Sequence, residues 1–308
     1  MTVLHQCLND YLSVRRALGF QLTRPAHQLT DFIRFLECAG ATTITTQLAL
    51  AWAMQTRAGT NCRADRLSAV RGFACYMQAI EPSTEIPPRD LLPRGNTRAT
   101  PHIYNDVEVS ALIAATQTLQ SAAARCLLST LIGLLSATGM RPGEALGLDR
   151  EDIDWERGIL TVRKGKFGKS REVPLHPTTM SALERYGRSR DELVPHSKGL
   201  SFFVSRAGNR PNHHAVDRTF RELVRRAGLP HVPSRSCPRL QDFRHTFTVR
   251  TVLDWYRDGL DVAVRLPLLS TYLGHANPIS TYWYLSATPE LLALAAERLQ
   301  RRHAGGPS

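Results

Sequence analysis

The chain has 308 residues, of which 43% are hydrophobic and 21% charged, a composition typical of soluble globular proteins and long enough for two domains. Its most apolar run, residues 122–138, is interrupted by Arg125, Ser129 and Ser136, which argues against a membrane span. The net charge of +12 favours a polyanionic partner, because basic groups near phosphates displace counterions, but charge alone does not separate DNA from RNA.

The N-terminal segment and the cysteines bear on the cellular compartment. The first 16 residues contain no basic segment followed by an apolar one, so nothing predicts secretion and we expect a cytoplasmic protein. The six cysteines lie singly, without a Cys-x-x-Cys pair. This pattern is typical of structural thiols in a reducing compartment, and we expect neither zinc nor disulfides.

Residues 1–80 carry apolar side chains at helical spacing only. The groups fall at residues 4–12, 29–36, 48–52 and 67–77, which predicts four short helices packed as a small bundle. Basic side chains of this region can line one face of the bundle, among them Arg57, Arg63, Arg66 and Arg71.

A proline-rich stretch follows this helical region. Five prolines fall within residues 81–101, together with Gly95, Asn96 and three arginines. Such a composition predicts an extended and irregular segment, because proline lacks a backbone donor and restricts the residue before it. We therefore expect an N-terminal helical domain at 1–90, a linker at 91–101 and a C-terminal domain at 102–308.

The C-terminal domain mixes helical and strand patterns. A helix is expected to begin at Asn105 or Asp106, and a buried helix at 122–138 should end at Gly139. Further predicted elements are strands at 152–155, 159–163, 171–175 and 201–205, a turn at 208–209, and helices at 178–190, at 213–227 and through the C-terminal third. The chain is therefore predicted to be mainly α-helical with a small antiparallel β-sheet.

Lysine is rare in this chain, and its distribution is informative. Only four of the 39 basic residues are lysines, and three of them lie in KGKFGK, residues 164–169, between two predicted strands. Arginine, with a pKa above ~12, cannot hand over a proton, whereas a lysine can act as a general acid. The cluster is thus either a proton donor for a reaction or a mobile turn rich in lysine and glycine.

The stretch ATGMRPGEALGL, residues 137–148, places an arginine at the start of a helix. Gly139 ends one helix and Pro142 suits the first position of the next, so Arg141 precedes that helix with an extended backbone. Free N–H groups, the positive end of a helix dipole and a guanidinium together favour phosphate binding. An arginine that forms an ordinary surface salt bridge would show the same pattern.

Four motifs occur in a fixed order along the chain. They are TGMRPGEALGL with Arg141, a hairpin with Lys166 that ends in SREVPL, FRHTF with Arg244, and LGH with His275, followed nine residues later by Tyr284. In order and spacing they resemble the tyrosine recombinases, also called phage-type integrases, over residues 100–290. The resemblance implies a SAM-like helical core-binding domain followed by an α+β catalytic domain.

The resemblance also assigns a role to each of these residues. Arg141 and Arg244 would grip the scissile phosphate, and Lys166 would protonate the departing 5′ oxygen. His275 would hydrogen-bond the phosphate or the nucleophile, and Tyr284 would attack to form a 3′-phosphotyrosyl link. Because this link conserves the broken bond, the resemblance implies no metal and no other cofactor.

Glu144 and Gln241 lie close in sequence to the two arginines. Glu144 follows Arg141 by one helical turn and can orient it. Gln241 stands three residues before Arg244, where the family usually has histidine. Glutamine can donate a hydrogen bond to a phosphate oxygen but cannot accept a proton from a tyrosine, so this difference bears on the rate more than on the reaction.

The last motif contains two tyrosines, Tyr282 and Tyr284. Residues two apart on a helix are separated by roughly 200°, so both hydroxyls cannot face one site. The family interval after His275 selects Tyr284, which leaves Tyr282 for packing or for contact with DNA. The segment PELLALAAERLQ, residues 289–300, would form an amphipathic helix that packs either on a neighbouring protomer or on its own domain.

We therefore expect a site-specific DNA recombinase or integrase of a mobile element. The resemblance implies that it acts on duplex DNA with inverted-repeat half-sites as a homo-oligomer, a synaptic tetramer, with other recombinases of the same element as further partners. A nucleoid-associated location would follow. Two alternatives remain, which are a catalytically weakened DNA-binding accessory protein of the same fold and a type IB topoisomerase, which relaxes DNA without exchanging partners.

Overall fold

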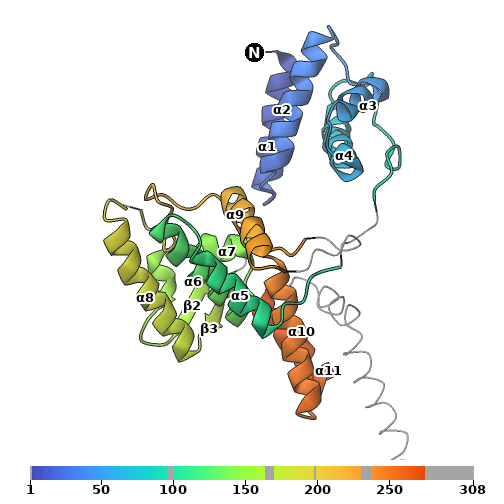
Figure 1. Ribbon diagram of the computed structural model, residues 1–308. Helices are drawn as coiled ribbons and strands as arrows, with labels where there is room; N and C mark the ends of the chain where they lie inside the picture. Colours follow the sequence, from blue (N-terminus) through green and yellow to red (C-terminus); the bar gives the residue numbers. More distant parts are fainter. Residues whose placement is uncertain (1, 96–99, 164–169, 198, 230–236, 275–308) are drawn as a thin grey trace, which may run out of the picture. The chain divides into compact units, whose positions relative to one another are not determined.

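The computed structural model describes residues 2–95, 100–163, 170–197, 199–229 and 237–274 (Figure 1). The chain divides into two compact units, residues 1–98 and 99–308, and each unit is described by itself. In the part of the chain that the structure describes, no helix is long and apolar enough to cross a membrane.

The described part of the first unit contains four helices, as the apolar spacing predicted. They are α1 (Val3–Ala17), α2 (Thr23–Cys38), α3 (Thr46–Met54) and α4 (Thr60–Met77). α4 contacts the other three helices, and its Val70 and Phe73 are fully buried. The Trp52 ring of α3 lies 5.1 Å from the Phe32 ring of α2, so the bundle closes around large aromatic side chains.

Two of the basic side chains expected to line one face of this bundle form contacts with other residues of the same unit. The Arg66 guanidinium stacks over the Trp52 ring at 3.7 Å and donates to Asp31 at 3.3 Å. Arg71 donates to the carbonyl of Pro87 at 2.6 Å. Cation–π stacking and hydrogen bonding hold these two arginines against their own unit, where they stabilise the bundle.

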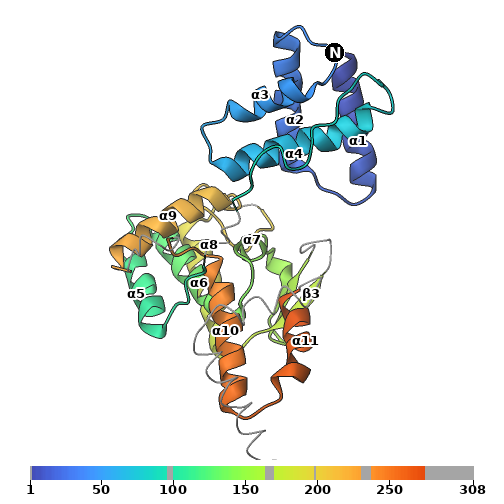
Figure 2. The same cartoon turned by 90° about the vertical axis from the view of Figure 1, so that its right-hand side faces the viewer.

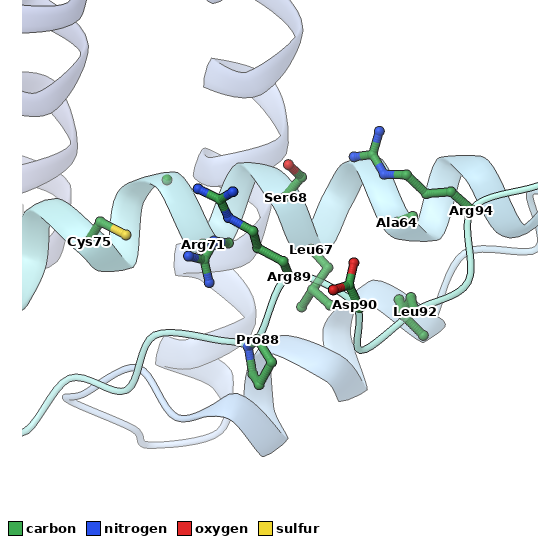
Figure 3. Close-up of a pocket in the computed structure, with 11 residues that line it drawn as sticks. Ala64, Leu67, Ser68, Arg71, Cys75, Pro88, Arg89, Asp90, Leu92 and Arg94 are labelled. Atoms are coloured by element: carbon green, nitrogen blue, oxygen red, sulfur yellow. The ribbon is translucent and has the colours of Figure 1, made fainter. Parts of the chain in front are cut away.

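Residues 81–95 contain no regular helix or strand, as their prolines predicted. The segment is nevertheless tied to the bundle, since Glu85 accepts a hydrogen bond from the Thr46 amide at 2.7 Å. Between this segment and α4 lies a pocket of about 490 Å³ (Figure 3). Its lining includes three basic side chains, Arg71, Arg89 and Arg94.

The described part of the second unit is mainly helical, and its helices lie close to their predicted bounds. They are α5 (Asp106–Thr116), α6 (Ala122–Thr138), α7 (Pro142–Leu146), α8 (Pro177–Leu193), α9 (His213–Arg226), α10 (Asp242–Arg257) and α11 (Val262–Leu273). α6 packs against α5, α8 and α10 (Figure 2), and its Leu131, Ile132 and Leu135 are fully buried. The most apolar run of the sequence is therefore the central helix of this unit.

Three strands of this unit form an antiparallel sheet in the order β1 (Ile153–Asp154), β2 (Ile159–Val162) and β3 (Arg171–Pro174). The strands predicted at 152–155, 159–163 and 171–175 are thus confirmed, with slightly shorter bounds. Val162 pairs with Arg171 at one end of the β2–β3 ladder. The lysine cluster, residues 164–169, lies between these two strands in the sequence and outside the described residues.

The strand predicted at 201–205 is wrong. Ser201 forms one isolated bridge with Asp149. The pairing stops there because the partner segment turns into a 3₁₀-helix at Arg150–Asp152. The side chains of Phe202 and Phe203 are buried all the same, so the apolar run reflects packing into the core rather than a place in a sheet.

Gly139 joins α6 to α7 in a conformation that favours glycine. Its φ of 60° lies in the left-handed region. A Cβ atom at this position would lie 2.5 Å from Cδ1 of Phe247 on α10. The turn and α10 therefore approach each other so closely that a larger residue would displace one of them.

Replacing Gly139 by alanine should destabilise the protein by about 2 kcal/mol or more, because the left-handed backbone and the contact with Phe247 are both unfavourable for alanine. Gly133 provides the matched control, since it lies inside α6 and a Cβ there would meet no atom within 4 Å. Gly133→Ala should raise stability by up to about 1 kcal/mol, as alanine favours helix. Urea unfolding measures both changes, and equal effects would contradict this account.

Candidate active site

α7 carries Arg141 at its start. Arg141 has an extended backbone (φ −72°, ψ 141°), and Pro142 occupies the first turn of the helix, as the sequence predicted. The Arg141 amide donates to Oε2 of Glu144 at 3.0 Å, and its Nη1 donates to Oε1 at 2.6 Å. The expected contact between Glu144 and Arg141 is therefore present, and it holds both the backbone and the side chain of the arginine.

Glu144 is also held from β3, by Arg171. Nη1 of Arg171 donates to Oε1 at 3.1 Å, and Nη2 donates to Oε2 at 2.7 Å. Burial alone would raise the pKa of Glu144, but the hydrogen bond and charge of Arg171, together with the hydrogen bonds of Arg141, outweigh it and lower the pKa to about 2. Glu144 is therefore ionised near neutral pH and can bind both arginines.

Arg244 enters the same region from the first turn of α10. Only 2% of its surface is exposed. Nη1 donates to the Gly139 carbonyl at 3.1 Å, and Nη2 donates to the Leu273 carbonyl at 2.5 Å. These carbonyls lie at the C-terminal ends of α6 and α11, where helix dipoles are negative, so two helix ends stabilise the buried cation.

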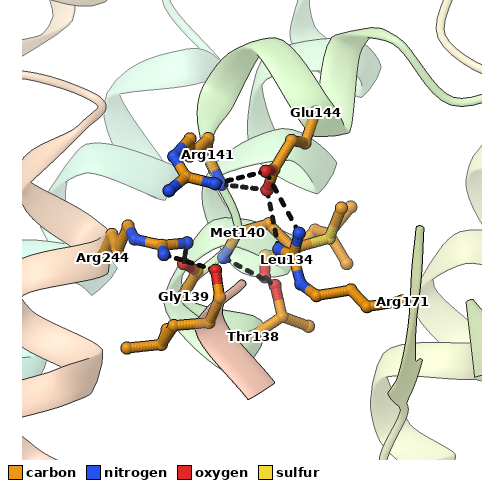
Figure 4. Close-up of polar contacts among 9 residues, drawn as sticks. Leu134, Thr138, Gly139, Met140, Arg141, Glu144, Arg171 and Arg244 are labelled. Carbon is orange, nitrogen blue, oxygen red and sulfur yellow. Dashed lines mark hydrogen bonds and ion pairs between the residues drawn. The ribbon is translucent and has the colours of Figure 1, made fainter. Parts of the chain in front are cut away.

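Figure 4 shows Arg141, Arg171 and Arg244 around the turn between α6 and α7. Arg244 binds Gly139, two residues before Arg141, and Glu144 links Arg141 to Arg171. We call these four charged residues the arginine cluster. Its three guanidinium groups and one carboxylate have a net positive charge, and the Arg141 side chain stays 26% exposed. An anionic group can therefore reach Arg141, whose paired N–H donors fit phosphate oxygens.

Gln241 lies directly before α10, three residues before Arg244. It is exposed, and its side chain forms no capping hydrogen bond with the helix. Residues three apart on a helix are neighbours, so Gln241 and Arg244 lie on the same side of this first turn. The polar amide of Gln241 is thus available on the side of α10 that contributes to the arginine cluster.

The other predicted site residues lie outside the described part of the chain. They are Lys166, His275 and Tyr284, and the same holds for Tyr282 and the segment 289–300. The residues that flank these gaps lie near Arg171. Val162 pairs with Arg171 across the sheet, and a Cβ on Gly274, the last residue described before His275, would lie 3.0 Å from Nη1 of Arg171.

Arg171 was not predicted as a site residue, although its motif SREVPL was part of the family pattern. The alternation of side chains along the strand could have indicated Arg171, because Arg171 shares a face of β3 with the buried Val173, whereas Glu172 is exposed. An arginine on the buried side of a strand needs a charged or polar partner. The sequence did not indicate that Tyr272 lies near these arginines either. Burial raises the pKa of its hydroxyl, although the charges of Arg171 and Arg244 lower it.

The described residues offer anion-binding groups rather than a metal-binding set. Within residues 2–95, 100–163, 170–197, 199–229 and 237–274, no group of three or more His, Cys, Asp or Glu side chains could hold a metal ion. All six cysteines are free thiols. His213, which begins α9, pairs with Asp217 of the same helix at 3.2 Å.

Comparison with known proteins identifies the family. Residues 104–290 match the Phage integrase family. The chain is 41% identical over 309 residues to y4rB of Sinorhizobium fredii, a protein named as an integrase/recombinase, and the match covers 98% of each chain. This protein is a tyrosine recombinase of the phage integrase family. Tyrosine recombinase XerD of Neisseria meningitidis serogroup B is 29% identical to it, over 72% of this chain and 71% of XerD.

Solved integrase structures share the fold of this tyrosine recombinase. The Tn1549 transposon integrase in complex with transposon right end DNA is similar with a TM-score of 0.63 and 16% identity, over 96% of this chain and 98% of that chain. A lambda integrase dimer bound to a core site is similar with a TM-score of 0.61 and 18% identity, over 90% and 96%. The predicted fold class, mainly helical with a small antiparallel sheet, is confirmed.

The Glu144 carboxylate should make the stability of this recombinase depend on pH. Its folded pKa of about 2 is below its ordinary value of 4.5, so its stabilising effect is complete well above pH 4.5 and is lost as the pH falls towards 2. The unfolding free energy of wild type relative to Glu144→Gln should therefore fall by about 2 kcal/mol between pH 6 and about pH 3. Urea unfolding at several pH values checks this, and a difference that is independent of pH would contradict it.

Proposed function

We propose that this tyrosine recombinase is a site-specific DNA recombinase that cuts and rejoins duplex DNA through a covalent link between Tyr284 and a 3′ phosphate. The arginine cluster is the observation that carries the proposal. Arg141 and Arg244 come from distant parts of the sequence and meet at the Gly139 turn, and Glu144 orients Arg141. The partly exposed guanidinium of Arg141, with the buried guanidinium of Arg244 beside the same turn, suits the two free oxygens of a phosphodiester.

The proposed reaction assigns a residue to the attack, to protonation of the leaving oxygen and to stabilisation of the added charge. The Tyr284 oxygen attacks phosphorus, the bond from phosphorus to the 5′ oxygen breaks, and Lys166 gives that oxygen a proton. Arg141 and Arg244 stabilise the added negative charge on the pentacoordinate phosphorus, which is where fixed positive charge has most effect. His275 hydrogen-bonds the phosphate or the nucleophile. Rejoining reverses these steps on the partner strand.

Two features of the chain bear on how this reaction proceeds. The phosphotyrosyl link conserves the energy of the broken phosphodiester, so rejoining requires no nucleotide. The exposed Gln241 can donate a hydrogen bond to a phosphate oxygen, but its amide cannot accept the tyrosine proton. We therefore propose that Gln241 contributes to phosphate binding and that the proton of the tyrosine hydroxyl passes to solvent water.

The substrate is proposed to be duplex DNA with inverted-repeat half-sites, bound by a homo-tetramer. The net charge of +12 supports a phosphate-rich partner. Similar folds have been solved as a lambda integrase dimer bound to a core site and as a lambda integrase tetramer bound to a Holliday junction. Residues 1–90 would form the core-binding domain, whose pocket is lined by Arg71 and Arg89 and by Arg94 of the linker at 91–101. Residues 102–308 would form the catalytic domain.

Replacing Tyr284 by phenylalanine tests this function directly. The change keeps the ring and removes only the hydroxyl, so folding and DNA binding should stay close to wild type while the covalent protein–DNA adduct disappears. Adduct formation on a nicked suicide substrate that carries the flanking repeats is the measurement.

Tyr282→Phe is the matched control and should still form the adduct. If Tyr282→Phe loses the adduct while Tyr284→Phe keeps it, Tyr282 is the nucleophile and the assignment to Tyr284 is wrong. If wild type binds these repeats without forming any adduct, the protein is a DNA-binding accessory protein. Relaxation of supercoiled DNA without strand exchange would identify a type IB topoisomerase instead.

The proposed role of Lys166 as the general acid can be tested separately. Lys166→Arg keeps the positive charge and should bind DNA normally, but it should cleave poorly because a guanidinium does not release its proton. A substrate with a 5′-bridging phosphorothiolate has a sulfur leaving group that departs without protonation, so it should restore cleavage by the variant. If this substrate fails to restore cleavage, Lys166 is not the general acid.

A further inference from the structure

The proposed reaction assigns no role to Arg171, although it belongs to the arginine cluster. Its two terminal nitrogens bind the two oxygens of Glu144 in a parallel pair, and its side chain is only 13% exposed. A paired contact of this kind fixes the plane of the carboxylate as well as its position. The same two oxygens bind the amide and Nη1 of Arg141, so the orientation of one arginine depends on the other.

Arg171 also contacts the end of α11. Gly274 caps that helix with a φ of 68°, and a Cβ there would lie 3.0 Å from Nη1 and 3.3 Å from Cδ of Arg171. The residue before it, Leu273, gives its carbonyl to Arg244. The side chain of Arg171 therefore lies where α7, β3 and the end of α11 meet.

We propose that Arg171 is a positioning residue of the recombinase site, which orients Arg141 through Glu144 and fixes the end of α11 against β3. The inference rests on the proposed function, because it assigns Arg171 to the same phosphate-binding cluster. Lysine cannot replace arginine in this role, because its single ammonium group cannot form a bidentate contact with both oxygens of Glu144. A small error in the orientation of Arg141 would then be carried to the scissile phosphate, where a displacement of about 1 Å can cost about 100-fold in rate.

A pH profile separates this role from a structural one. Arg171 provides the largest influences that lower the pKa of Glu144, so their removal should move this pKa upward from its low value, while the hydrogen bonds of Arg141 continue to lower it. Among the described residues, the charged and titratable groups around this carboxylate are Arg141 of α7 and Arg171 of β3, with Arg244 of α10 and Tyr272 of α11 beyond them. In Arg171→Gln the loss of charge on Glu144 at mildly acidic pH should release Arg141, so cleavage should decline on the acid side where wild type does not.

Arg210, in the loop before α9, offers a matched control because its side chain binds the far end of α7. Its Nη1 donates to the Leu146 carbonyl at the end of α7, and its Nη2 pairs with Asp149 at 2.6 Å. Arg210→Gln removes an arginine and an ion pair from the opposite end of α7 without touching Glu144. Its cleavage should follow the wild-type pH profile.

The experiment measures single-turnover cleavage of the suicide substrate by the full-length protein across pH, together with DNA affinity and thermal unfolding. Arg171→Lys should keep DNA affinity and lose about 100-fold in cleavage rate. Arg171→Gln should add the acid-side decline, and the double variant Arg171→Gln/Glu144→Gln should cleave no more slowly than the slower single variant, because both changes break one contact.

The outcomes are distinguishable. If wild type forms no adduct, the proposed function itself fails. If wild type forms the adduct and Arg171→Lys cleaves at the wild-type rate, Arg171 does not position the site. The role is also overturned if both Arg171 variants lose cleavage only in proportion to lost thermal stability, as Arg210→Gln would. Should Arg171→Gln fail to fold, the rate and affinity of Arg171→Lys decide the question.

Discussion

The carboxylate of Glu144 binds two guanidinium groups at once, and the geometry of the described site depends on this contact. A buried carboxylate is unfavourable without partners, so the chain must supply cations where Glu144 lies. Arg141 comes from the same short helix, but Arg171 comes from a strand, and their shared partner ties α7 to the sheet. The low pKa of Glu144 follows from this double contact and keeps the carboxylate charged near neutral pH.

A second constraint places Arg244 in the same cluster. The cation is buried, and carbonyls at the ends of α6 and α11 accept its hydrogen bonds. These carbonyls are close to it because Gly139 allows α10 to approach the turn, with Phe247 packed where a side chain would otherwise stand. The glycine thus acts on the site through packing, although it offers no functional group. Phosphate binding by Arg141 and Arg244 would depend on this close approach as much as on the two charges.

Much of the fold was predictable from the sequence because helical periodicity is a strong local signal. The four N-terminal helices, the buried helix α6 and its end at Gly139 all lie where apolar spacing and a single glycine indicated. The prediction of a strand at 201–205 failed because an apolar run indicates burial but does not indicate pairing with another strand. Arg66, expected on a basic face of the first unit, is held by stacking on Trp52, a contact that depends on two helices that the sequence does not place together.

The sequence by itself determined the candidate residues, because arginine, glutamine, lysine, histidine and tyrosine occur at family intervals that are independent of packing. It also determined that Glu144 stands one turn beyond Arg141, since that contact is local. Only the tertiary structure decided that Arg171 completes the cluster and that Arg244 lies at two helix ends. These contacts join residues far apart in the chain, and their geometry arises when α6, α10, α11 and the sheet pack together. Local patterns contain no information about such distances, so no spacing in the sequence could have shown them.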